Sequence, residues 1–152
     1  MEPEILDLES FLPYRLNRLA DAVSREFSKI YRERHGLTRP EWRTLATLGQ
    51  FGIMTATQIG AHSAMHKTKV SRAVAELENR RWLTRTPAPT DRRNEHLTLT
   101  KAGKEAYADL VPMAKEFERR LSKAMNVARF AEFDYGLGQL ENFVLGDHRK
   151  EI

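Results

Sequence analysis

The fold of this 152-residue chain is decided by residues 91–103, which read Asp91-Arg92-Arg93-Asn94-Glu95-His96-Leu97-Thr98-Leu99-Thr100-Lys101-Ala102-Gly103. Polar and apolar residues alternate from residue 94 to residue 100, with Leu97 and Leu99 on one side, which is typical of a half-buried strand. Thr100 then stands where a helix N-cap is expected, because its hydroxyl can accept a backbone N–H of the next turn. We therefore predict a strand that passes directly into a helix.

A second strand is expected just upstream. Residues 82–86 are aromatic, β-branched and basic, a composition that favours extended backbone. Residues 87–91 contain two prolines and an aspartate, which indicates a turn or loop. The two strands should form a hairpin with Arg92 and Arg93 at its tip.

Helices surround this hairpin. Apolar residues recur at spacings of three and four, which predicts four helices before it and two after it. The third and fourth helices are separated only by a tight turn near residues 62–66, so they form a helix-turn-helix. The fourth would bury Val70, Ala73, Val74 and Leu77 and expose its basic and hydroxyl side chains. The fold class is therefore mainly α with a small β-hairpin (α+β).

Charge is concentrated in one stretch. Residues 62–93 hold eight lysines and arginines but only three acidic residues, whereas the rest of the chain has 17 basic and 18 acidic residues. A local excess of positive charge is typical of a surface that docks on a polyanion, although a solvated charged face gives the same count. The chain has no cysteine, which excludes disulfides, thiol nucleophiles and thiolate metal sites.

Residues 91–103 resemble the wing signature of the MarR family, which reads D-x-R, three variable residues, then apolar-x-L-T-x-x-G. Every specified position is met. Upstream, Val70-Ser71-Arg72, Leu77-Glu78 and Trp82-Leu83-Thr84-Arg85 are similar to the family's recognition helix and the start of its wing. One position departs from the pattern: Arg81 stands where a glycine commonly precedes the wing strand, which places the local turn geometry in question.

The resemblance implies a winged helix-turn-helix with long N- and C-terminal dimerisation helices. We expect one MarR-type domain over residues 1–152, with a DNA-binding lobe at about 38–100 and dimerisation helices at 1–36 and 101–146. The implied partner is double-stranded DNA with a pseudo-palindromic operator, read by a homodimer whose lobes meet successive major grooves. The predicted function is sequence-specific transcription regulation, with a repressor favoured over an activator.

The expected DNA contacts come from the helix-turn-helix and the hairpin. Arg93 is expected in the minor groove, since a narrow groove attracts inserted arginine, and the family pattern implies that Asp91 holds it by a salt bridge. Arg85 and Arg92 are expected at phosphates. The full set is Ser63, His66, Lys67, Thr68, Lys69, Ser71, Arg72, Arg85, Asp91, Arg92, Arg93 and Asn94.

Two further sets follow from the resemblance. Many relatives release DNA when they bind a small aromatic or phenolic acid, or its coenzyme A thioester, and the candidate effector residues are Tyr14, Arg15, Arg18, His35 and Trp42. Core packing of Trp42 and solvent exposure of the arginines are the competing explanations. The candidate dimer-interface residues are Phe117, Leu121, Phe130, Phe133, Leu137 and Leu140, which in the alternative would pack within one subunit.

Other functions have weaker support. No phosphate-binding glycine loop, nucleophile elbow or carboxylate pair points to an enzyme, and no cofactor is expected. His62 and His66 are four residues apart, but a turn lies between them and no further ligand completes a metal site, so a metal-sensing regulator is a lesser alternative. A non-specific architectural DNA-binding protein is another. No apolar run is long enough for a membrane helix, and a cytoplasmic location is expected.

Overall fold

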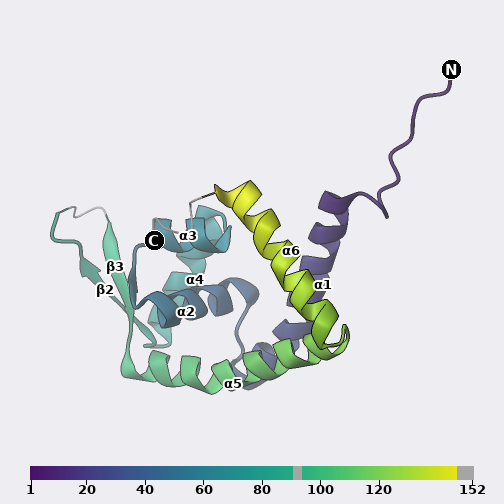
Figure 1. The fold of residues 1–152 in the computed structure, drawn as a ribbon. Helices are drawn as coiled ribbons and strands as arrows, with labels where there is room; N and C mark the ends of the chain where they lie inside the picture. Colours follow the sequence, from purple (N-terminus) through teal and green to yellow (C-terminus); the bar gives the residue numbers. More distant parts are fainter. Residues whose placement is uncertain (91–93, 147–152) are drawn as a thin grey trace. The chain divides into compact units, whose positions relative to one another are not determined.

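The computed structural model describes residues 1–90 and 94–146 (Figure 1). It confirms the mainly helical fold with a small antiparallel sheet. The elements are α1 (Leu12–His35), α2 (Arg39–Phe51), β1 (Ile53–Met54), α3 (Ala56–Ser63), α4 (Lys67–Asn79), β2 (Leu83–Pro87), β3 (Glu95–Leu99), α5 (Lys101–Lys123) and α6 (Val127–Leu145). None of the helices in the described part of the chain is long and apolar enough to cross a membrane.

The chain divides into two compact units, residues 1–39 and the residues from Pro40 on. The first unit contains α1, which begins with a proline in its first turn and ends at Gly36. Gly36 has φ 66° and donates its N–H to the carbonyl of Arg32 at 2.8 Å. Glycine ends helices in this way because it takes a left-handed backbone without a Cβ clash, so Gly36 is the C-terminal stop of α1. The second unit contains every element of the predicted DNA-binding lobe.

The sheet has three strands in the order β1-β3-β2. β1 was not predicted: it is two residues long, with Ile53 opposite Thr98 and Met54 opposite Leu97. Two residues are too few to show an alternating pattern, and this strand exists because the outer edge of β3 offers free backbone partners.

The hairpin of β2 and β3 has one apolar face and one polar face. Directly opposite residues of an antiparallel pair share a face, and the pairs Leu83–Leu99, Arg85–Leu97 and Pro87–Glu95 alternate with Thr84–Thr98 and Thr86–His96. The three leucines are buried, so the first set is the inner face. On the outer face the hydroxyls of Thr84 and Thr98 lie 3.0 Å apart. The predicted half-buried alternation is confirmed.

A left-handed residue joins α4 to the hairpin. Arg81 has φ 63°, and its N–H donates to the carbonyl of Glu78 while the N–H of Trp82 donates to that of Leu77, both at 2.9 Å. These two bonds form a Schellman motif, whose left-handed position is most often glycine. The turn at Arg81, whose geometry the sequence placed in question, is therefore an ordinary Schellman turn. Its left-handed position is occupied by arginine instead of glycine.

The threonine and glycine of residues 100–103 lock the hairpin to α5. The Thr100 hydroxyl accepts the N–H of Gly103 at 3.1 Å and donates to the carbonyl of Arg81 at 2.7 Å. A Cβ on Gly103 would lie 2.1 Å from the carbonyl oxygen of Trp82, so only glycine permits this close approach. The motif thus holds α4, the hairpin and α5 together at one point.

Candidate nucleic-acid interface

Helix α4 presents one buried face and one polar, basic face. Val70, Ala73, Val74 and Leu77 are buried, as their helical spacing predicts. The side chains expected to contact DNA from this helix all lie on the exposed side: Lys67, Thr68, Lys69, Ser71 and Arg72. The structure therefore brings five of the predicted site residues together on one surface.

The helix-turn-helix is capped at the start of both helices. Thr55 and Gln58 form a reciprocal capping box at α3, with side chain to backbone distances of 2.9 and 3.2 Å. At α4 the N-cap is His66, whose Nδ1 accepts the N–H of Thr68 at 3.3 Å. A ring nitrogen that accepts carries no proton, so in this geometry Nε2 carries the proton of the neutral ring and can donate outward.

The two histidines of the turn have different surroundings. The ring of His62 packs edge-on against Phe51, with centroids 5.0 Å apart, while His66 caps α4. In residues 1–90 and 94–146, no three histidine, aspartate or glutamate side chains are grouped so that they could hold a metal ion.

Ser63 has a structural partner. Its half-buried hydroxyl lies 3.3 Å from that of Thr47, and its carbonyl accepts an N–H of Arg43 at 3.4 Å. These contacts hold the end of α3 against α2. The DNA contact expected of Ser63 stays a prediction, and its hydroxyl would have to be shared with Thr47.

Arg85 is engaged with two carboxylates. Its Nε donates to Glu78 of α4 at 3.0 Å, and its Nη1 donates to Glu95 of β3 at 3.5 Å. The sequence placed Arg85 among the phosphate contacts because it is basic and lies in the wing. It could not show these pairs, because they depend on how the hairpin folds against α4.

Part of the predicted hairpin tip lies outside the described residues. This applies to Asp91, Arg92 and Arg93, so their ion pair and their groove contacts stay predictions. Asn94 is described: it is exposed, and its carbonyl accepts the N–H of Ala88 at 3.2 Å. Figure 1 shows strands β2 and β3 extending beyond α2 and α4.

Sequence reasoning missed the role of Arg80. This residue contributes to the local charge excess, yet it is half-buried and its Nη2 lies 3.6 Å from the buried carboxylate of Glu41 in α2. Its Nε also pairs with Glu76 at 3.2 Å, and its guanidinium lies 5.1 Å from the centre of the Trp82 ring. Arg80 therefore ties α2 to the end of α4. The spacing of four from Glu76 was the one signal that could have indicated a pair.

The candidate effector residues are divided between the two units. Tyr14, Arg15 and Arg18 are exposed on α1, where the guanidinium of Arg18 lies 5.7 Å from the centre of the Tyr14 ring. His35 is the last residue of the same helix, whereas Trp42 is half-buried in α2 of the second unit. Their assembly into one site stays a prediction.

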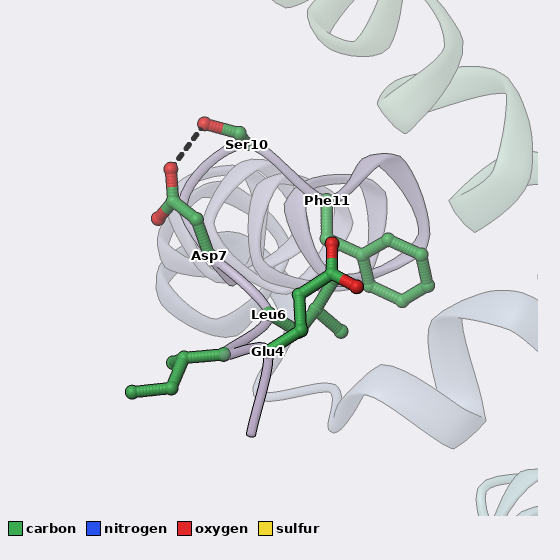
Figure 2. A pocket seen from close by; sticks show the side chains of 6 residues that line it. Glu4, Leu6, Asp7, Ser10 and Phe11 are labelled. Carbon is green, nitrogen blue, oxygen red and sulfur yellow. Dashed lines mark hydrogen bonds between the residues drawn. The ribbon is translucent and has the colours of Figure 1, made fainter. Parts of the chain in front are cut away.

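One pocket within the first unit involves none of these residues. Figure 2 shows it at the chain start, lined by Glu4, Ile5, Leu6, Asp7, Ser10 and Phe11. The hydroxyl of Ser10 donates to Asp7 and lowers the pKa of that carboxyl below its usual range. Two carboxylates in the lining oppose the binding of an anionic acid, so this pocket does not suit the predicted effector.

The candidate interface residues lie in α5 and α6. Phe133 and Leu137 are exposed, as is Leu121, while Phe117, Phe130 and Leu140 are half-buried. None of the 19 residues of α6 is buried. The N-cap of this helix is Asn126, whose side chain accepts the N–H of Arg129 at 3.0 Å. The helix is therefore capped, and yet its apolar side chains are at most half-buried.

Comparisons with known proteins agree with this architecture. The sequence profile of the MarR family matches residues 35–94. The HTH-type transcriptional regulator YwoH of Bacillus subtilis (strain 168) is 26% identical over 110 residues, which cover 72% of this chain and 79% of that protein.

Solved structures give the same result over a longer span. A MarR family transcriptional regulator from Silicibacter pomeroyi DSS-3 is 27% identical with a TM-score of 0.74, covering 90% of this chain and 98% of that one. BpsR of Bordetella bronchiseptica, whose DNA binding is regulated by 6-hydroxynicotinic acid, has a TM-score of 0.78 at 20% identity and covers 91% of this chain and 99% of its own. Through its wing signature, its helix-turn-helix and these relatives, the chain is similar to the MarR family of transcriptional regulators, whose sequence profile matches its residues 35–94.

Proposed function

We propose that the protein binds a specific pseudo-palindromic DNA operator as a homodimer and represses transcription until a small aromatic acid releases it. The observation that carries the proposal is the exposed face of α4. Two lysines, an arginine and two hydroxyl residues lie there on a helix whose opposite face is buried. A helix of this kind fits the major groove, where such side chains donate to base edges and phosphates.

The hairpin supplies the second contact. In this proposal Arg92 and Arg93 reach the adjacent minor groove, because narrow grooves attract arginine, and Asp91 orients Arg93. Lys67 and Lys69, in the first turn of α4, contact phosphates, where the helix N-terminus also favours negative charge. Base reading falls to Thr68, Ser71 and Arg72 of the same exposed face.

The homodimer is supported by the apolar surface of α6. Phe133 is 44% and Phe143 87% exposed, on a helix with no buried residue. Apolar surface of this extent on one helix usually marks an interface. A two-fold symmetric dimer also explains how two copies of α4 would reach half-sites about 34–36 Å apart.

The effector is proposed by chemical class. BpsR responds to 6-hydroxynicotinic acid, and Arg15 and Arg18 could pair with a carboxylate or with the phosphates of a coenzyme A thioester. An acid that binds one dimer geometry more tightly than the DNA-bound one would shift the population away from DNA.

The test is a fluorescence-anisotropy titration of purified protein with DNA flanking its own gene, at fixed salt and with excess unrelated DNA. We expect tight, competitor-resistant binding of one dimer per site. Arg72→Ala should weaken it by about tenfold, from the loss of a base contact. Lys115→Ala, which removes an exposed charge from α5, is the matched control and should change little. Binding that unrelated DNA abolishes would instead indicate an architectural DNA-binding protein.

The effector has a separate test. A thermal-shift screen of aromatic and phenolic acids and their coenzyme A thioesters should find a compound that raises the melting temperature and releases DNA. Arg18→Ala should reduce both effects without changing DNA affinity in the absence of the compound. A screen in which no acid stabilises the protein would contradict this part of the proposal and leave DNA binding intact.

A further inference from the structure

The strongest unexplained feature of the DNA-binding lobe is a basic residue that faces inward. In the register of the hairpin, Arg85 lies opposite Leu97 and two positions from Leu83. Both leucines are buried, so Arg85 belongs to the inner face, which packs toward α4, rather than to the outer face with Thr84 and Thr86. A side chain on this face is poorly placed to be a simple phosphate contact.

Two carboxylates meet Arg85 there. Glu78 is in the last turn of α4 and accepts from Nε at 3.0 Å, and Glu95 is the first residue of β3 and accepts from Nη1 at 3.5 Å. All three side chains are partly exposed, between 37% and 47%. One planar guanidinium thus links the recognition helix to both strands of the hairpin, which the single ammonium of lysine could not do with the same geometry.

The position of this link matters because it lies at the outer end of the row of buried leucines in the hairpin. Inward-facing leucines occur at residues 83, 97 and 99, and the next inward positions outward along the strands are Arg85, Pro87 and Glu95. Within β2 and β3, Arg85 is therefore where the inward-facing leucines end and ion pairing begins, and Ala88 is buried further along the chain. Its ion pairs would set the angle at which the hairpin leaves α4.

We infer that Arg85 is a positioning residue for operator binding: with Glu78 and Glu95 it fixes the hairpin relative to α4, so that both elements reach their grooves at once. This rests on the proposed DNA binding and replaces the phosphate contact expected of Arg85 from the sequence. Glu78 and Glu95 are acidic, but in this inference they strengthen DNA binding because they hold Arg85 and the hairpin in place.

Glu78→Gln separates this role from simple electrostatics. Removing a negative charge near DNA raises affinity if only the total charge matters. If the link positions the hairpin, the same change weakens operator binding, by about fivefold for a partly exposed pair. Glu105→Gln, at an exposed position of α5, removes the same charge elsewhere and is the matched control. Arg85→Lys keeps the positive charge but loses the planar guanidinium that pairs with both carboxylates, so it should weaken operator binding about as much as Arg85→Ala.

Two further readouts complete the test. The double variant Arg85→Ala with Glu78→Gln should bind no more weakly than Arg85→Ala alone, since both changes break one link. The slope of log affinity against log salt should stay that of the wild type in Arg85→Ala, whereas loss of a phosphate contact lowers its magnitude by about 0.9.

Hydrogen exchange on the DNA-free protein keeps the inference testable apart from the proposed function. Backbone amides of β2 and β3 should exchange about fivefold faster in Arg85→Ala and Glu78→Gln than in wild type or Glu105→Gln. Unchanged exchange, tighter operator binding by Glu78→Gln, or a reduced salt slope in Arg85→Ala would overturn the inference. If the wild-type protein binds no operator in the DNA titration, the proposed function is overturned instead. That titration is carried out before any variant is made, so the two failures are distinguishable.

Discussion

Replacing Arg81 by glycine should make the protein more stable, although it removes a charged side chain from the DNA-binding lobe. Arg81 has φ 63°, in the left-handed region. Its N–H and that of Trp82 close the end of α4 by bonds to the carbonyls of Glu78 and Leu77. The hydroxyl of Thr100 also donates to the Arg81 carbonyl. The surrounding hydrogen bonds therefore hold this backbone conformation whatever side chain stands there.

The size of the effect follows from two opposing terms. A left-handed backbone costs a residue with a Cβ about 1–2 kcal/mol, and glycine avoids that cost. Glycine also gives the unfolded chain more freedom, which removes about 0.4–1 kcal/mol of stability. The difference predicts a gain of about 0.5–1 kcal/mol in the free energy of unfolding. For a chain of this length, that corresponds to a rise of about 1–4 °C in melting temperature.

The assay is urea unfolding followed by circular dichroism at one fixed protein concentration, since dimerisation would couple stability to concentration. Arg81→Gly is compared with Arg81→Ala, because both lack the arginine side chain and differ only by the Cβ. Ala75 is exposed within α4 and provides the matched control. Ala75→Gly should lose about 1 kcal/mol, since glycine is unfavourable in a helix.

We expect the effect of glycine relative to alanine on the free energy of unfolding to have opposite signs at the two positions. Glycine should be more stabilising than alanine at position 81 and less stabilising at position 75. The reasoning is refuted if Arg81→Gly is equal to or less stable than Arg81→Ala while Ala75→Gly behaves as expected. That result would mean that the backbone at position 81 is not held in the left-handed region in solution.

Three other predictions concern the same fold. Gly103→Ala should destabilise the protein by about 3 kcal/mol in urea unfolding, because the new Cβ would meet the Trp82 carbonyl oxygen at 2.1 Å; a loss below about 0.5 kcal/mol would show that the contact relaxes easily. Thr100→Val should lose about 1 kcal/mol as the α5 cap is removed, and an unchanged midpoint would contradict the cap. The guanidinium of Arg25 lowers the pKa of the Asp21 carboxyl, so this pair stabilises the protein above the ordinary aspartate pKa and less as pH falls through the lowered value. The difference in melting temperature between wild type and Asp21→Asn should therefore shrink as the pH is lowered. A difference that grows as the pH is lowered would contradict the stabilising role of this pair.

Local chemistry made much of the fold predictable. The alternation around Leu97 and Leu99 identifies a half-buried strand because side chains alternate across a sheet. Thr100 caps the helix predicted to begin there, and Thr55 and Asn126 cap α3 and α6 in the same way, since a cap depends only on residues within one turn. The inward face of α4 followed in the same way from helical spacing.

For the candidate site, the sequence predicts which side chains of α4 are exposed, because helical spacing alone decides this. Lys67, Lys69 and Arg72 are exposed as expected. Ser63 and Arg85 also looked like DNA contacts by residue type, but one bonds with Thr47 of α2 and the other with Glu78 of α4. Those partners come from other elements, and no spacing in the sequence indicates them.

The sequence alone determined the order of the helices and of the two hairpin strands, the cap at Thr100 and the buried face of α4, because these depend on residues a few positions apart. The tertiary structure decided the rest. It paired the two residues of β1 with β3, placed Arg81 in a left-handed turn, and brought Arg80 and Arg85 within reach of carboxylates. Residue type shows that an arginine can bind an anion. Which anion it binds depends on what the folded chain brings within reach.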